Sequence, residues 1–190
     1  MSKVLHGLDM FHIAELTEDT TTSVDYETPE PLLGAVNVNV QPNTESNTFY
    51  ADNGAYAVLN SLGDIDVDVE VADLPFAMQK TIYGHTEENE VQFASKDDIS
   101  IDLALGFRAK TSTGGYRFYW LLKGKAELIP IEHQTDEGNT TPQTAKIKLK
   151  FMPLQHNGRW KAQAESSEQL DAAKWFKDVV YKGDILTSTP

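Results

Sequence analysis

The densest group of side chains that could do chemistry is a row of carboxylates at every second position: Asp64, Asp66, Asp68 and Glu70. Paired carboxylates act as general acid and base when their surroundings push their pKa values apart. On a β-strand, alternate side chains stand about 7 Å apart along one face, and nothing in this row would separate their pKa values. A solvated acidic face is therefore the favoured interpretation.

The same spacing occurs at the start of a calcium-binding loop. That loop needs Gly at its sixth position and a bidentate Glu at its twelfth. Here the two positions hold Val69 and Pro75. The sequence therefore excludes this type of calcium site.

Other catalytic and metal-binding patterns are also absent from the sequence. The histidines are too widely separated for a metal-ligand motif: His6, His12, His85, His133 and His156. No nucleophile elbow, phosphate-binding loop or dinucleotide fingerprint occurs. Cysteine is missing, which excludes disulfides and thiol nucleophiles. We expect a protein that is not an enzyme and uses no cofactor or metal.

The net charge of −13 is confined to the first part of the 190-residue chain. Residues 1–79 hold 14 carboxylates and one basic residue, Lys3, whereas the remaining residues hold 15 of each sign. Proteins that grip nucleic acid show the opposite sign, because Lys and Arg displace the counterions of phosphate. Tight DNA or RNA binding is disfavoured, although DNA could pass nearby.

Length and hydropathy favour one soluble domain, residues 1–190. No apolar run approaches the roughly 20 residues that span a bilayer, and the N-terminus lacks the apolar core of a signal peptide. We expect no membrane contact.

Alternation of apolar and polar residues dominates the chain and indicates strands with one buried face. Residues 34–40 form one such strand, which we expect to stop at Pro42. Residues 41–61 are predicted to be a long excursion or hairpin with an Asn53-Gly54 turn. Strict alternation returns over residues 64–72.

Further elements follow these strands along the chain. Residues 75–83 predict a helix that is preceded by Leu74 and ended by Gly84. Strands are predicted over residues 99–109, 116–131, 144–154 and 159–164, the last two paired around Asn157-Gly158. Residues 17–23 and 134–143 are predicted linkers, the second a flexible loop. Ser166 and Gln169 suggest a capping box for a C-terminal helix over residues 166–180.

These elements predict a mainly β fold, a β-sandwich or partial barrel with one central α-helix and a C-terminal helix. The aromatic run Tyr116, Phe118, Tyr119 and Trp120 could stack on bases or sugars. It lies within a strongly apolar strand. Core and subunit packing is therefore favoured.

A second charged row has the opposite sign. Lys146, Lys148 and Lys150 alternate with apolar residues, as the carboxylates of residues 64–70 do. If the two strands were neighbours, opposed charges would add about 0.2 to 1 kcal/mol per pair and specify register or partner. Two unrelated solvated faces are an equally weighted alternative.

The segment from residue 34 to residue 56, Gly-Ala-Val-Asn-Val-Asn-Val followed by Thr-Phe-Tyr-Ala-Asp-Asn-Gly-Ala-Tyr, resembles the major tail proteins of long, non-contractile-tailed bacteriophages. The alternating acidic strand, the Leu74-Pro75 helix start, the Gly-Tyr-Arg-Phe-Tyr strand and a C-terminal Trp175-Phe176 follow in that family's order. The resemblance covers most of the chain.

The resemblance implies a tail-tube fold, with inner strands of six subunits forming a shared barrel in a hexameric ring. Rings would stack into the tail tube, the conduit for DNA ejection. The predicted ring-stacking loop is residues 41–61, with contacts at Tyr50, Asp52, Asn53, Gly54 and Tyr56. Implied partners are further copies, the tape measure protein, the tail terminator, distal tail proteins and phage DNA in transit. Assembly would take place in the host cytoplasm, and the product would be the virion tail.

Physical arguments agree with this expectation at two points. Ring closure removes exposed sheet edges, and luminal carboxylates repel phosphate near the wall. The acidic row is therefore a candidate lumen or interface face. The alternatives are a tube protein of a contractile tail or secretion system, and a monomeric β-sandwich binding module, for instance for carbohydrate.

Overall fold

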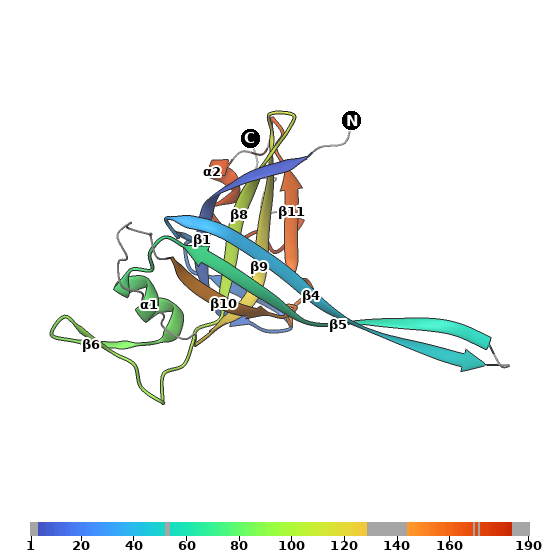
Figure 1. Ribbon diagram of the computed structural model, residues 1–190, viewed down its shortest axis with the longest axis horizontal. Coiled ribbons are helices and arrows are strands. Elements are labelled where there is room, and N and C mark those ends of the chain that lie inside the picture. The colour runs from blue at the N-terminus through green and yellow to red at the C-terminus, as the bar shows by residue number, and fades with distance from the viewer. Residues whose placement is uncertain (1–3, 52–53, 129–143, 169, 171, 184–190) are drawn as a thin grey trace, which may run out of the picture.

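A computed structural model describes residues 4–51, 54–128, 144–168, 170 and 172–183 of the chain (Figure 1). The fold is mainly β, as the alternation predicted. The strands are β1 (Leu5–Asp19), β2 (Val24–Tyr26), β3 (Glu30–Pro31), β4 (Ala35–Ala51), β5 (Gly54–Val71), β6 (Thr86–Glu88), β7 (Val91–Phe93), β8 (Leu103–Thr111), β9 (Tyr116–Glu127), β10 (Ala145–Phe151) and β11 (Lys161–Glu165), and the helices are α1 (Phe76–Tyr83) and α2 (Ala172–Trp175).

Nine of these strands form one large antiparallel sheet in the order β2-β1-β8-β9-β10-β5-β4, with β11 on β9 and β3 on β1. The sheet curls, so that β4 at one end contacts β1 near the other, although no described ladder joins these two strands. The remaining pair, β6 and β7, forms a separate small hairpin. The described chain is therefore closer to the predicted partial barrel than to a sandwich of two sheets.

The inside of the curled sheet is the larger hydrophobic core. Strict alternation on β5 turns Ile65, Val67, Val69 and Val71 inward, where they are at most 1% exposed. Opposite them, β10 contributes Ile147, Leu149 and Phe151. Because side chains alternate along a strand, the polar residues of β5 and β10 must point to the outer face.

The outer face of β1, β8 and β9 carries a second core, which the C-terminal segment covers. Phe118 and Trp120 of β9 are buried there against Trp175 and Phe176. The Trp120 indole Nε1 donates a hydrogen bond of 3.1 Å to the carbonyl oxygen of Trp175. Phe118 and Trp120 of the aromatic run are thus core, as the sequence favoured, whereas Tyr116 and Tyr119 are only partly buried.

The predicted C-terminal helix over residues 166–180 is wrong for the described part of that range, which holds only the four-residue α2. Ser166 does not cap a helix. Its backbone N–H donates to the Tyr116 carbonyl, and its hydroxyl accepts the Tyr116 N–H. Pairing with β9 therefore keeps this residue extended.

Helix α1 lies where the sequence predicted it. Pro75 precedes it, and Gly84 ends it in the left-handed conformation with φ 74°, donating its N–H to the Lys80 carbonyl. A Cβ on Gly84 would lie 2.4 Å from the Ile99 carbonyl oxygen. Glycine is therefore required at this position by conformation and by space.

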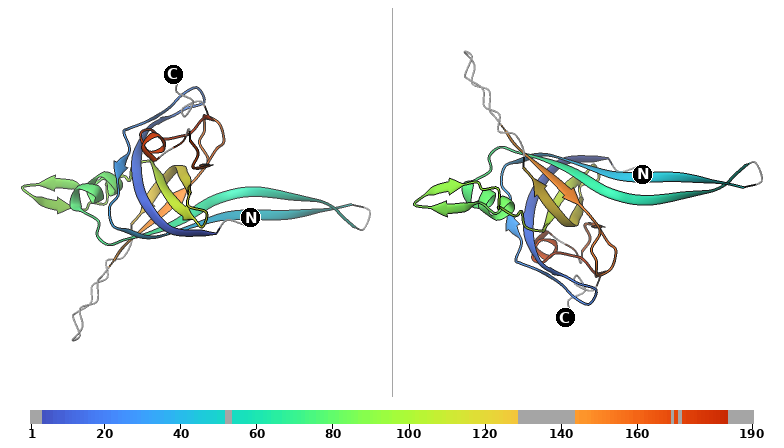
Figure 2. Two further views of the ribbon diagram at one scale, coloured as in Figure 1. Left: turned by 90° about the horizontal axis from the view of Figure 1, so that it is seen from above. Right: turned by 90° about the horizontal axis from the view of Figure 1, so that it is seen from below.

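The segment over residues 41–61, predicted to be a long excursion or hairpin, is a regular hairpin in its described part. Strand β4 continues past Pro42 to Ala51 and pairs with β5 back to Gly54. Proline is tolerated because β4 is an edge strand, and the register shifts between Pro42 and Thr44. Figures 1 and 2 show this hairpin projecting far beyond the rest of the molecule.

The predicted hairpin of the last two strands is also wrong. β10 and β11 do not pair with each other; they follow each other along β9, at Gly124 to Glu127 and at Arg117 to Leu121. The turn near Asn157 exists, since Leu154 N–H donates to the Arg159 carbonyl. After β10 the chain leaves the edge of β9, reverses at this turn, and returns to the same edge of β9 as β11. The turn therefore does not join two strands that pair with each other.

Strand β1 was missed by the sequence analysis, which predicted a linker over residues 17–23. Its register against β8 shifts twice, between His6 and Leu8 and between Asp9 and His12. Met10 in the second irregularity has a positive φ of 54°. These bulges break the alternation that marks a strand in sequence.

Two aromatic rings lie directly on glycines of the neighbouring strand. A Cβ on Gly106 would come within 2.7 Å of the Trp120 ring, and one on Gly124 within 2.8 Å of the Phe151 ring. Each glycine is paired in register with its aromatic residue. The rings fill the space that the missing side chains leave.

We expect Gly124→Ala to lower the free energy of unfolding by about 1 to 3 kcal/mol, because the fully buried Phe151 ring must move in a packed core. Urea denaturation measures the change. Gly183→Ala is the matched control, since nothing lies within 4 Å of its Cβ position. Equal stability of the two variants would contradict this packing argument.

Candidate functional site

The structure brings the acidic and the basic row together on one face. β10 pairs with β5 so that Lys146 lies opposite Glu70, Lys148 opposite Asp68 and Lys150 opposite Asp66. Directly opposed residues of an antiparallel pair project to the same face. We call this surface, with Asp64, Lys125 and Glu127 at its margin, the charged face.

Lys150 is the centre of the charged face. Its Nζ lies 3.6 Å from an Asp64 oxygen, 3.7 Å from Asp66 and 3.8 Å from Glu127. All four side chains are 41 to 59% exposed, so solvent screens each pair. The network therefore contributes little to stability, although its opposed charges favour this pairing of β5 with β10.

The charged face is close to neutral. Asn37, Asn39 and Gln41 of β4 lie opposite the carboxylates on their other side. They add hydrogen-bonding amides but no charge, and the Asn43 Nδ2 donates to Asp66 at 2.8 Å. Because the lysines of β10 balance most of the carboxylates, this face alone is not a strongly acidic wall.

The other candidate residues lie on the outer part of the β4–β5 hairpin. We call residues 44–51 and 54–62 the distal hairpin. Ladder pairing of β5 with β10 covers only Ile65 to Val71, so in the described chain the two distal strands pair only with each other. Tyr50 and Tyr56 are 69 and 75% exposed there, and Gly54 begins β5. Asp52 and Asn53 lie outside the described residues.

The distal hairpin exposes apolar side chains on both of its faces. Phe49 lies opposite Ala57 and Asn47 opposite Leu59, which places Phe49 and Leu59 on one face. Val58, one position away, lies on the other face with Leu62. All four are exposed. A two-faced apolar ribbon cannot be buried by folding back onto a single surface.

The polar groups do not assemble a catalytic or metal site in the part of the chain that the structure describes. No group of three or more His, Asp or Glu side chains there could hold a metal ion. None of the described helices is long and apolar enough to cross a bilayer. The predicted flexible loop over residues 134–143 lies outside the described residues.

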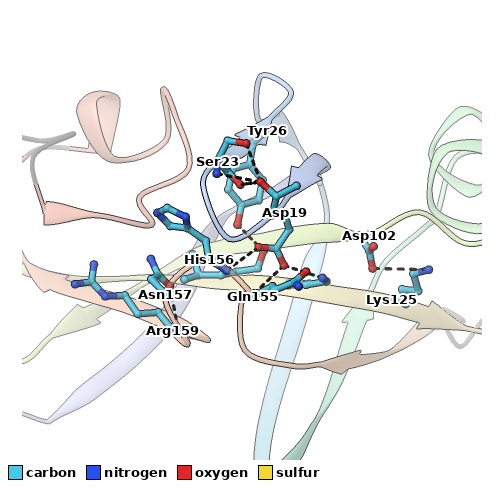
Figure 3. A network of polar contacts seen from close by, with 12 residues as sticks. Asp19, Ser23, Tyr26, Asp102, Lys125, Gln155, His156, Asn157 and Arg159 are labelled. Carbon is cyan, nitrogen blue, oxygen red and sulfur yellow. Dashed lines mark hydrogen bonds and ion pairs between the residues drawn. The ribbon is translucent and has the colours of Figure 1, made fainter.

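One buried polar network was missed by the sequence analysis (Figure 3). The Asp19 side chain, 3% exposed, accepts hydrogen bonds from Lys123 Nζ at 2.7 Å and from the backbone N–H groups of Gln155 and His156 at 2.9 and 3.2 Å. It joins the end of β1 to β9 and to the excursion between β10 and β11. Its position in a predicted linker gave no signal of this role.

The surroundings of Asp19 act on its pKa in opposite directions. Burial raises the pKa, whereas the two backbone N–H donors and the Lys123 ammonium lower it, and the net result is a lowered pKa. Nearby, burial raises the pKa of Tyr26, so its hydroxyl stays neutral and donates to the Leu122 carbonyl at 2.9 Å. These contacts make the network a structural anchor.

We expect Lys150→Glu to lower the free energy of unfolding by about 1 to 2 kcal/mol at low salt, because it turns three attractions into repulsions. The loss should shrink at high salt. Lys177→Glu is the control, since this exposed lysine makes no ion pair with a described residue. Urea denaturation at two ionic strengths tests the prediction, and a salt-independent loss would contradict it.

We expect Asp19→Asn to cost about 1.5 to 3 kcal/mol at pH 7, the range for hydrogen bonds to a charged group. A lowered folded-state pKa stabilises the protein above the unfolded value of about 4, and this contribution disappears as pH falls through the folded value. The variant and the wild type should therefore converge in acid. Asp25→Asn, at an exposed position, is the control, and a pH-independent difference would contradict the assignment.

Comparison with known proteins adds no family to this picture. No protein-family model matches the chain, and no curated protein matches it.

Proposed function

We propose that this chain is a structural, non-enzymatic subunit that polymerises into a tube, the tail tube of a long-tailed phage. Copies would form hexameric rings whose inner strands share a barrel, and the rings would stack into the conduit for DNA ejection. Tape measure, terminator and distal tail proteins would be its further partners in the virion. The motif resemblance supplies the phage assignment, and the geometry supports self-assembly.

The observation that carries this proposal is the distal hairpin. An exposed β-ribbon with free edges is a template for pairing with another chain. This ribbon holds a single charged residue among its described positions, Glu45, and exposes Phe49, Tyr50 and Tyr56. Charges and prolines normally protect such edges, so their scarcity here favours a ribbon covered by further copies.

The net charge of the chain supports a conduit for DNA, but the acidic row of β5 supports it less than the sequence alone suggested. The chain as a whole carries −13, which keeps copies soluble and disfavours DNA binding. On the charged face, however, Lys146, Lys148 and Lys150 lie opposite three of the five carboxylates and offset their charge. Low affinity for DNA would follow from net charge, while the charged face would set strand register.

The carbohydrate-binding alternative is weakened by burial. Phe118 and Trp120 are at most 1% exposed, so the β9 aromatic run offers no continuous platform for a sugar ring. A tube protein of a contractile tail or secretion system remains the alternative in the same structural class, because fold does not specify which machine a tube serves.

Purified full-length protein should form rings or tubes visible by electron microscopy, with a mass by light scattering that rises with concentration. We expect the double variant Tyr56→Ser, Leu59→Ser to weaken assembly strongly. Loss of a buried interface anchor costs at least about 2 kcal/mol, which is roughly a 30-fold change in affinity.

Val91→Ser is the matched control, because Val91 is also an exposed apolar strand residue, 51% accessible, but lies on β7 outside the hairpin. Circular dichroism should show all variants folded, since none of the replaced side chains is buried. A wild-type protein that stays monomeric at micromolar concentration would overturn the proposed function.

A further inference from the structure

An apolar groove of about 500 Å³ opens between the beginning of β1 and the proximal half of β4. Its floor is the inner face of the sheet, with Phe107 of β8 and Tyr119 and Leu121 of β9. Its walls include Leu8 of β1 and Val38, Val40 and Pro42 of β4, and Trp160 and Lys161 also line it.

The groove exists because the curled sheet does not close. At Leu5 to Asp9, β1 pairs with β8 on one edge, and β2 and β3 pair with β1 only from His12 onward. Strand β4 pairs with β5 alone. Within the described ladders, the backbone edges on both sides of the groove are therefore unpaired, which is how a sheet accepts an added strand.

The distal hairpin has the complementary properties. Its two strands are extended, their outer edges are unpaired in the described chain, and its apolar side chains are exposed. It projects away from the body in every view (Figures 1 and 2). The hairpin therefore suits the groove of another copy.

The areas and charges are consistent with a second copy as the occupant. Phe49, Tyr50 and Tyr56 together expose about 400 Å², taking about 200 Å² for a whole aromatic side chain. That is about half of the 800 Å² per partner in a standard interface. The basic Lys161 lines the groove, and Glu45 is the charged residue of the described distal hairpin.

We infer that the groove between β1 and β4 of one copy receives the distal hairpin of a second copy. Apolar side chains of the hairpin fill the groove, and its backbone edge pairs with an open edge of the receiving sheet. Donor and acceptor surfaces differ, so the contact is heterologous and propagates from copy to copy. This inference rests on the proposed self-assembly and names the surface that accepts the hairpin.

Cysteine cross-linking tests the contact directly, because the natural chain has no cysteine. Two full-length single-cysteine chains, Asn60→Cys on the hairpin and Lys161→Cys at the groove, are mixed and treated with a short bis-maleimide. Both positions are exposed, so each variant should fold. A heterodimer band then reports hairpin-to-groove contact between copies.

The control mixture pairs Asn60→Cys with Val91→Cys on the small β6–β7 hairpin, which lies at the end of the molecule opposite the β4–β5 hairpin (Figure 1). We expect at least about tenfold more heterodimer from the groove pair, because docking holds its thiols at millimolar effective concentration. Val40→Cys, inside the groove wall, should behave like Lys161→Cys.

The failures of the two proposals are distinguishable. Light scattering of the same samples shows whether copies associate. Association with equal cross-linking of the groove and control pairs would overturn the groove assignment and leave the proposed assembly standing. Absence of association would overturn both.

Discussion

The charged face of the candidate site depends on strict side-chain alternation along β5. Ile65, Val67, Val69 and Val71 are buried inside the curled sheet, and this burial forces the carboxylates between them outward. A one-residue slip would place the acids in the core, so register is strongly specified. Pairing with β5 therefore suits both faces of β10. Its apolar residues lie opposite apolar residues on the inner face, and its lysines lie opposite carboxylates on the outer face.

The sequence predicted those parts of the fold that local chemistry determines. The alternation of β5 and β10 and the Pro75 and Gly84 boundaries of α1 are readable from residue types alone, and the structure confirms them. Where tertiary pairing outweighs local preference, prediction failed. Ser166 has the side chain of a helix cap but pairs with Tyr116, and the turn near Asn157 suggested a hairpin between strands that both lie on β9.

The candidate site was predictable to a similar extent. Charge patterning identified the acidic row of β5 and the basic row of β10, but it left open whether the two strands are neighbours. The residue types of a single sequence do not show which of several strands, distant along the chain, pair with each other. Asp19 could not be found, because its three donors come from β9 and from a distant excursion. The groove could not be found either, because it results from an unclosed gap between β1 and β4 rather than from any motif.

The isolation of the distal hairpin has a thermodynamic consequence for the order of its own strands. A two-stranded ribbon that pairs with nothing else is marginally stable in water at best. Any contact that binds only the paired form stabilises it by mass action. Strand pairing at the tip and the proposed subunit association would therefore be linked equilibria. Each arriving copy would help to complete the folding of the one it joins.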